Sequence, residues 1–296
     1  LIAHQVAPPI AAGNTVVLKP SGDTPISALK MGEMLKNAGL PDGVLNILPC
    51  EPPVAEKLAV DPRVNYLSFI GSARVGWHLR RLVAYGTRVG LEHGGNAPAI
   101  IEPDADLEIA AKICLTGGYY HAGQVCVSVQ RLYLHRSIAE QFIEIFKPMV
   151  ESLIVGDPTS PDTEVGPLIR PPEVERVSSW VNQAVENGAE IVTGGQVLDH
   201  NCYAPTLLTN VHPGMDMVDK EIFGPVVGLF AYDELDVAID AANAGPHGFQ
   251  AAIFTQNINT AFRAARKLDF TAVMINDSTA FRVDWMPFGG RHESGL

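Results

Sequence analysis

Short apolar runs alternate with longer amphipathic stretches through the first hundred residues. The apolar runs are rich in Val, Leu and Ile and lie between turn residues, which predicts strands at Thr15–Leu18, Val44–Leu48, Tyr66–Ile70, Val89–Glu92 and Ala97–Ile101. The amphipathic stretches predict helices at Pro25–Asn37, with Asp23 or Thr24 as the N-terminal cap, and at Ser72–Ala84. Strands that alternate with helices are typical of an α/β fold with a largely parallel sheet.

A second α/β unit follows the turn at Gly94-Gly95-Asn96, which is the candidate domain boundary. We therefore expect two domains, residues 1–94 and residues 95–296. The expected helices of the second domain are Asp106–Gly117, Ile138–Leu153, Glu173–Asn187 and Leu235–Ala244, and its expected strands are Val226–Ala231, Ala251–Thr255 and Ala272–Ile275. A Pro-rich loop from Asp157 to Pro172 and a turn at Gly194-Gly195 separate these elements.

Composition narrows the class of partner. The 296 residues are 47% hydrophobic and 18% charged, which is enough apolar material for a sizeable core. The 33 acidic and 21 basic residues give a net charge of −12, which repels nucleic acid and anionic membrane surfaces. The four cysteines lie far apart without a CxxC pair, so we expect no metal site and no disulfide, and a cytoplasmic location.

The two ends of the chain carry no targeting pattern. No apolar run approaches the roughly 20 residues of a membrane helix, and the first residues lack the basic region of a signal peptide. The chain starts with Leu1 and not with Met, and it stops abruptly at Leu296. We expect it to be a fragment of a larger protein that lacks both ends.

Cys126 and Glu92 are the candidate catalytic residues. The cysteine follows Gly123-Gln124-Val125, and the glutamate precedes His93-Gly94-Gly95. A thiolate that attacks a carbonyl and a carboxylate that activates water together make a complete reaction scheme. Taken alone, each residue has a plainer interpretation, because free cysteines are commonly buried hydrophobes and glutamates at strand ends are commonly solvated.

Four further segments have the geometry of ligand sites. Phe69–Gly76 contains a strand, a glycine and a helix start, which offers backbone N–H groups to a phosphate, although it is not GxGxxG. Lys19 ends a strand in Gly13–Pro20, as ligand-binding residues of doubly wound sheets do. Glu221–Val226 and Met286–Arg291 are Gly- and Pro-containing turns. A solvated lysine, a capping acid and plain connecting loops are the structural alternatives.

Together these segments, in this order along the whole chain, resemble the aldehyde dehydrogenase superfamily. The resemblance implies a two-domain α/β fold in which Cys126 forms a thiohemiacetal, hydride passes to a nicotinamide, and Glu92 activates the water that hydrolyses the thioester. The cofactor-binding residues that it implies are Lys19, Ser21, Gly22, Gly71, Ser72, Gly76, Glu221 and Phe223. Many NAD-preferring members have glutamate where this chain has Gly22, so both NAD and NADP remain open.

The resemblance also bears on substrate and assembly. The run Tyr120–Arg131 is most similar to the branch that acts on small aldehydes such as lactaldehyde, glyceraldehyde 3-phosphate or phosphonoacetaldehyde. His121 stands where the family often has asparagine, and we expect it to pack or to shape the substrate site. Arg282, Arg291 and His292 flank the 287–290 loop and are candidates to meet an anionic substrate, with solvation as the alternative.

The resemblance places two functional segments outside the chain. These are the asparagine of the oxyanion site, upstream of Leu1, and an oligomerisation strand, beyond Leu296. Loss of one oxyanion donor typically costs about 3–4 kcal/mol, so we expect the chain alone to be inactive or a poor catalyst and the complete protein to be an active homo-oligomer. A non-catalytic relative that binds nucleotide or serves a structural role, and a cofactor-free esterase, are the alternative functions.

Overall fold

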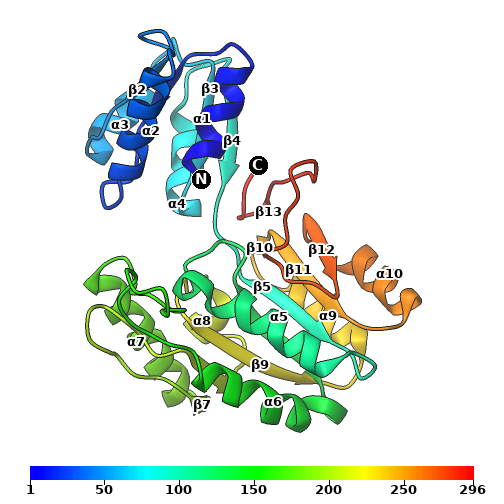
Figure 1. Ribbon diagram of the computed structural model, residues 1–296. Helices are drawn as coiled ribbons and strands as arrows, with labels where there is room; N and C mark the ends of the chain where they lie inside the picture. The colour runs from blue at the N-terminus through cyan, green and yellow to red at the C-terminus, as the bar shows by residue number, and fades with distance from the viewer. The chain divides into compact units, whose positions relative to one another are not determined.

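The computed structural model describes residues 1–296, which form two compact units, Leu1–Leu91 and Glu92–Leu296 (Figure 1). The division falls three residues before the end of the first domain that the glycine turn indicated. Which unit binds a cofactor and which performs catalysis stays a prediction.

The first unit contains four helices and two small sheets. Its elements are α1 (Ile2–Ala11), β1 (Val16–Leu18), α2 (Ile26–Asn37), β2 (Leu45–Ile47), α3 (Pro52–Ala59), β3 (Tyr66–Ile70), α4 (Ala73–Leu82) and β4 (Arg88–Glu92). Strand β1 pairs with β2 in parallel, and β3 pairs with β4 in a separate two-stranded sheet. The expected strands therefore form, but within residues 1–91 they lie in two pairs and not in one sheet.

Proline explains the main differences from the expected helices of this unit. Helix α1 contains Pro8 and Pro9, which ordinarily end a helix, so the sequence pattern did not indicate it. Helix α3 was also not expected, although its prolines occupy the first turn, where no intrahelical donor is lost. Helix α2 has Pro25 as its N-terminal cap residue and no side-chain cap bond, so the expected capping by Asp23 or Thr24 is wrong.

The second unit is built on a seven-stranded sheet in the order β12-β11-β5-β6-β9-β8-β7. All neighbours in this sheet are parallel except β7 and β8, which are antiparallel. Its strands are β5 (Ala97–Ile101), β6 (Val129–His135), β7 (Glu190–Thr193), β8 (Thr206–Thr209), β9 (Val226–Tyr232), β11 (Gln250–Phe254) and β12 (Ala272–Ile275). A short antiparallel pair, β10 (His247–Gly248) with β13 (Arg291–His292), lies outside the sheet.

Helices cover both faces of this sheet. They are α5 (Leu107–Tyr119), α6 (Ala139–Glu151), α7 (Pro171–Glu186), α8 (Asp216–Asp219), α9 (Leu235–Asn243) and α10 (Ile258–Lys267), with short 3-10 turns at Tyr120–Gly123 and Arg136–Ile138. Residues of α5, α6 and α7 share one core with Leu132 and Leu134, whereas α9 and α10 share the other core with Tyr133. Successive residues of β6 thus point to opposite cores, as a strand buried on both faces requires.

Two helix boundaries show how local chemistry sets the elements. Helix α5 begins after Asp106, whose carboxylate accepts a hydrogen bond from the Ile109 N–H at 3.1 Å. Helix α7 starts at Pro171, two residues before the expected start, because prolines are compatible with the first helical turn. No helix combines the length and apolar character that spanning a bilayer requires.

Candidate active site

Three adjacent parallel strands bring the candidate catalytic residues together. Strands β5, β6 and β9 are consecutive neighbours in the large sheet, so their amino ends lie at one edge. Glu92, Cys126 and Glu221 each stand only a few residues before one of these strands. Residues that are far apart in the chain therefore meet at this edge of the second unit.

The thiol of Cys126 contacts the carboxylate of Glu92. The Cys126 Sγ donates a hydrogen bond to Glu92 Oε1 at 3.7 Å. Burial, followed by the charges of Glu92 and Glu221, raises the pKa of the Cys126 thiol to about 12. The thiol is therefore protonated at neutral pH, and Glu92 is the nearest described acceptor for its proton.

The Glu221 carboxylate contacts the glycine pair that follows His93. Its Oε1 accepts a hydrogen bond from the Gly95 N–H at 2.9 Å. Burial raises the pKa of Glu221 to about 7, against the opposing effects of the Gly95 amide and the Arg176 charge. A Cβ at Gly94 would overlap the Glu221 carboxylate, so only glycine permits this approach.

The loop that carries Cys126 has an unusual backbone. His121 and Ala122 have φ values of 50° and 56°, in the left-handed region that non-glycine residues rarely occupy. Gly123 has φ 68°, and a Cβ there would overlap the carbonyl of Gly224. The surrounding structure holds the Cys126 loop in a strained conformation, as is common at functional sites.

Gln130 holds the segment around Glu221 in place and was not among the expected site residues. Its Nε2 donates to the carbonyls of Met217 and Lys220, each at 2.7 Å, and its Oε1 accepts from the Ile222 N–H at 3.1 Å. Gln130 is 4% exposed, so these bonds are buried. No local pattern could have indicated contacts that span about ninety residues.

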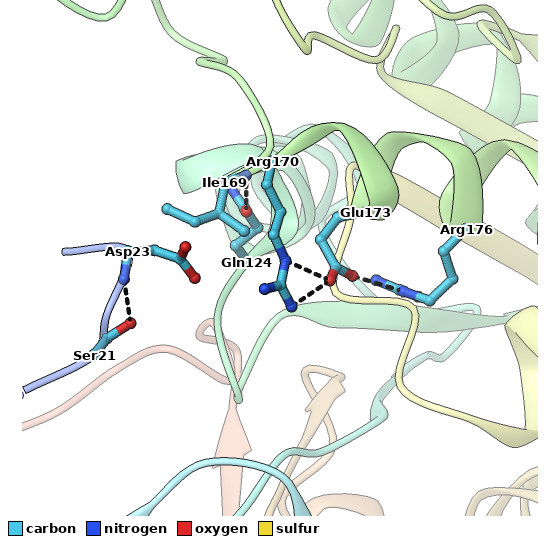
Figure 2. A network of polar contacts seen from close by, with 7 residues as sticks. All are labelled: Ser21, Asp23, Gln124, Ile169, Arg170, Glu173 and Arg176. Carbon is cyan, nitrogen blue, oxygen red and sulfur yellow. Dashed lines mark hydrogen bonds and ion pairs between the residues drawn. The ribbon is translucent and has the colours of Figure 1, made fainter. Parts of the chain in front are cut away.

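Figure 2 shows a polar network that includes Gln124, two residues before Cys126. The Gln124 Oε1 accepts from the Ile169 N–H at 2.9 Å. Next to Ile169, Arg170 contacts Glu173, which also pairs with Arg176 at 2.9 Å. Both arginines lower the pKa of Glu173, and Arg176 in turn stabilises the charged form of Glu221. No local sequence pattern indicated this role of Arg176.

All the other expected cofactor residues except Phe223 lie in the first unit, in the segment after β1 and around the start of α4. The Lys19 Nζ donates to the carbonyl of Pro20 at 2.8 Å. Ser21 accepts a hydrogen bond from the Asp23 N–H at 3.3 Å (Figure 2). Ser72, after Gly71, is the extended residue before α4 and makes no side-chain cap bond, which leaves the start of α4 suited to an anionic group. Gly76 is buried in the first turns of α4.

The remaining candidate residues, Phe223 and the three basic residues near the 287–290 loop, differ in the contacts that hold their side chains. Phe223 has φ 44° and is 38% exposed, two residues after Glu221. Arg291 and His292 both contact Asp269, each at 2.6 Å. The Arg282 guanidinium donates to the Met286 carbonyl at 2.7 Å and lies 4.3 Å from the centre of the Phe288 ring. Of these three candidates to meet an anionic substrate, Arg282 is the one without a carboxylate partner.

The fold and this site define a doubly wound α/β protein with a buried thiol beside a carboxylate. The model of the aldehyde dehydrogenase family matches residues 1–296, and the chain belongs to this family. The expected family and fold class are therefore confirmed. The chain is 44% identical over 296 residues to a 3-sulfolactaldehyde dehydrogenase from Priestia aryabhattai, with all of this chain and 62% of that protein covered.

Solved structures agree with this assignment. Lactaldehyde dehydrogenase from Escherichia coli matches with a TM-score of 0.96 and 36% identity, over 100% of this chain and 63% of that one. The glyceraldehyde-3-phosphate dehydrogenase from Methanocaldococcus jannaschii, complexed with NADP, matches with a TM-score of 0.95 and 38% identity, over 99% of this chain and 65% of that one. The chain thus spans less than two thirds of each of these relatives.

Proposed function

We propose that the complete protein oxidises a small aldehyde to a carboxylic acid with NAD or NADP, through a thioester on Cys126. The observation that carries this proposal is the contact of the Cys126 thiol with the Glu92 carboxylate, in a chain of the aldehyde dehydrogenase family. The relatives described above are named for hydroxylated aldehydes of this size, two of them anionic. Arg282, which makes no ion pair, is our candidate partner for an anionic substituent.

The chain's own groups account for the covalent steps. Glu92 accepts the thiol proton, and the Cys126 thiolate forms a C–S bond to the aldehyde carbon, which gives a thiohemiacetal. The chemistry that a bound nicotinamide supplies is acceptance of the hydride whose loss leaves a thioester. Glu92 releases this first proton to solvent and accepts another from water as the hydroxide adds to the thioester carbon. When the C–S bond breaks, the acid leaves and Glu92 returns the proton to the sulfur.

Two features of the chain suit a nicotinamide dinucleotide. The start of α4, without a side-chain cap, suits a phosphate, and the buried Glu221 carboxylate beside the glycine pair is an acceptor for ribose hydroxyls. Lys19, Ser21, Gly22, Gly71, Ser72, Gly76 and Phe223 complete the proposed set. A Cβ at Gly22 would meet nothing within 4 Å, so space remains there for either cofactor.

The direct test is the absorbance of the reduced nicotinamide, measured with the complete protein, each cofactor and a panel of aldehydes. The panel contains 3-sulfolactaldehyde, lactaldehyde and glyceraldehyde 3-phosphate, with a longer apolar aldehyde as control. We expect reduction of at least one cofactor with a small hydroxylated aldehyde. If no aldehyde gives reduction while either cofactor still raises the melting temperature, the chain is a nucleotide-binding relative and the proposal is wrong.

A further inference from the structure

The segment at residues 293–295, which we call the strap, pairs with the chain at Glu92 and His93. Glu92 forms an antiparallel bridge with Gly295, and the His93 N–H donates to the carbonyl of Ser294 at 2.9 Å. The His93 side chain adds a third link, because its Nδ1 lies 2.8 Å from the carbonyl of Glu293 and must donate to it. His93 is only 2% exposed, so this bond is shielded from water.

The strap is itself held to the second unit. The Glu293 N–H donates to the carbonyl of Pro246 at 3.0 Å, and the Ser294 Oγ accepts from the Gly248 N–H at 3.1 Å. Ser294 is fully buried. Through the strap, Glu92 and His93 are therefore linked to strand β10.

We propose that His93 is a positioning residue, which ties the chain at Glu92 to the strap through its hydrogen bond to Glu293 and so holds the Glu92 carboxylate against Cys126. This inference rests on the proposed function, in which Glu92 is the base. It explains why a polar ring is buried one residue after that base. A polar group in such a place needs a hydrogen bond to offset the loss of its contacts with water.

The glycine pair after His93 leaves the adjacent backbone less restricted, so the hydrogen bond of the His93 ring has more effect there. Gly94 and Gly95 restrict the backbone less than other residues do, and Gly94 has to be glycine because Glu221 fills the space of its side chain. Without the ring's bond, the chain between β4 and this flexible pair would keep only its main-chain contacts to the strap. A carboxylate that must stay near a thiol for two proton transfers gains from the additional bond.

The reactivity of Cys126 reports the position of Glu92 without any need for turnover. The titratable groups that face the thiol are Glu92, Glu221 and Tyr120, and burial together with Cys126 raises the pKa of Tyr120 to about 12. A nearby carboxylate disfavours the thiolate, so displacement of Glu92 lowers the thiol pKa. The rate of iodoacetamide alkylation at Cys126, followed by peptide mass against pH in the complete protein, measures this pKa.

The variants are His93→Leu, which removes the ring donor, and His93→Asn, whose amide N–H can replace Nδ1. Glu92→Gln is the reference. We expect Glu92→Gln to lower the midpoint of alkylation by about one pH unit. His93→Leu should move it in the same direction and speed alkylation several-fold near pH 8, while His93→Asn stays close to the native profile. On the Glu92→Gln background, His93→Leu should add nothing.

Three results would overturn the inference: a native profile for His93→Leu, an equal shift for both His93 variants, or the same shift for His93→Leu when Glu92 is already Gln. If His93→Leu does not fold, Ser294→Ala, which frees the strap from Gly248, must give the same downward shift or the inference is wrong. If the protein shows the expected alkylation pattern but reduces no cofactor, the positioning role of His93 stands and only the proposed function is refuted.

Discussion

The two units of the chain differ in how they fix their functional groups. In residues 92–296, a seven-stranded sheet is buried between two helical layers, and each layer contributes a core. In residues 1–91, the strands form two separate pairs, and a small core with the buried residues Val6, Leu18 and Ala28 lies among α1, α2, β1 and β2. Large apolar side chains such as Tyr66 and Tyr85 remain exposed there.

The site residues follow this difference. Glu221 and Cys126 make part-buried hydrogen bonds and lie against Gly94 and Gly95, where an added methyl group would overlap other atoms. Gly22 and Gly71, by contrast, lie in exposed turns of the first unit. Tertiary packing thus positions the residues of the proposed chemistry, whereas local turns position most of the proposed cofactor contacts of the first unit. Substitutions in the two regions should therefore have different effects.

Replacement of the nucleophile should have the largest effect. Cys126→Ala removes the only thiol beside Glu92, so we expect turnover to fall by at least about 10³-fold without loss of folding. Cys50→Ala is the matched control, because this cysteine lies in the first unit and has no proposed role. Steady-state rates of cofactor reduction and circular dichroism check both variants. Equal rates for the native protein and Cys126→Ala would refute the covalent mechanism.

The second effect is a pH dependence of stability that arises from Glu221. Because burial raises the pKa of Glu221 to about 7, the folded protein keeps a proton between about pH 4.5 and pH 7 that the unfolded chain releases. The free energy of unfolding should therefore fall as the pH rises through this window, by about 3 kcal/mol, and this contribution should be constant above it.

Urea unfolding of the native protein and of Glu221→Gln at several pH values isolates this contribution. The difference between their unfolding free energies should change across the window and not elsewhere. In the first unit, Asp61 contributes a pH dependence of the unfolding free energy with the opposite sign, because hydrogen bonds from Arg63 lower its pKa to about 2. Parallel pH profiles for the two proteins would show that Glu221 is not held in the buried environment described.

A methyl group at Gly94 should disturb the site by a smaller amount. Its Cβ would overlap the Glu221 carboxylate, so Gly94→Ala must displace that side chain at a cost of about 1–3 kcal/mol in unfolding free energy. Gly245→Ala is the matched control in the same unit, since its Cβ would meet nothing within 4 Å. Thermal unfolding measures both, and equal melting temperatures would contradict the close approach at Gly94.

The smallest effect is expected in the open turn of the first unit. Gly22→Glu has room for its side chain, and its carboxylate would repel the 2′-phosphate of NADP more than it affects NAD. We expect the Kd for NADP to rise several-fold relative to that for NAD, with little change in stability. Calorimetric titration of the variant with both cofactors measures this ratio. An unchanged ratio would place the adenosine ribose elsewhere.

The sequence predicts some elements of this fold well and others poorly, for physical reasons. Strands β11 and β12 are short apolar runs between turns and were expected almost to the residue. Helix α1 was not, because Pro8 and Pro9 argue against a helix locally and tertiary packing of Val6 overrides that preference. Helix α10 and strands β7 and β8 were also not expected.

The site shows the same limit. Cys126 and Glu92 were predicted as a pair from their residue types and their setting, and the structure places their side chains in contact. The roles of Gln130, Arg176 and His93 were not predicted, because each depends on contacts with segments that only the folded sheet brings near. Local patterns indicate which groups carry the chemistry, whereas the residues that hold them require the structure.

The most direct test of the Cys126–Glu92 pair is to stop the reaction between its two halves. Glu92→Gln cannot activate water. At alkaline pH its thiol can still lose the proton to solvent, so the complete protein with cofactor and a turned-over aldehyde should accumulate an acyl group on Cys126. Peptide mass spectrometry should find the mass of the acyl group on this cysteine, together with one equivalent of reduced cofactor. An unmodified Cys126 in a variant that turns over at the native rate would contradict the account.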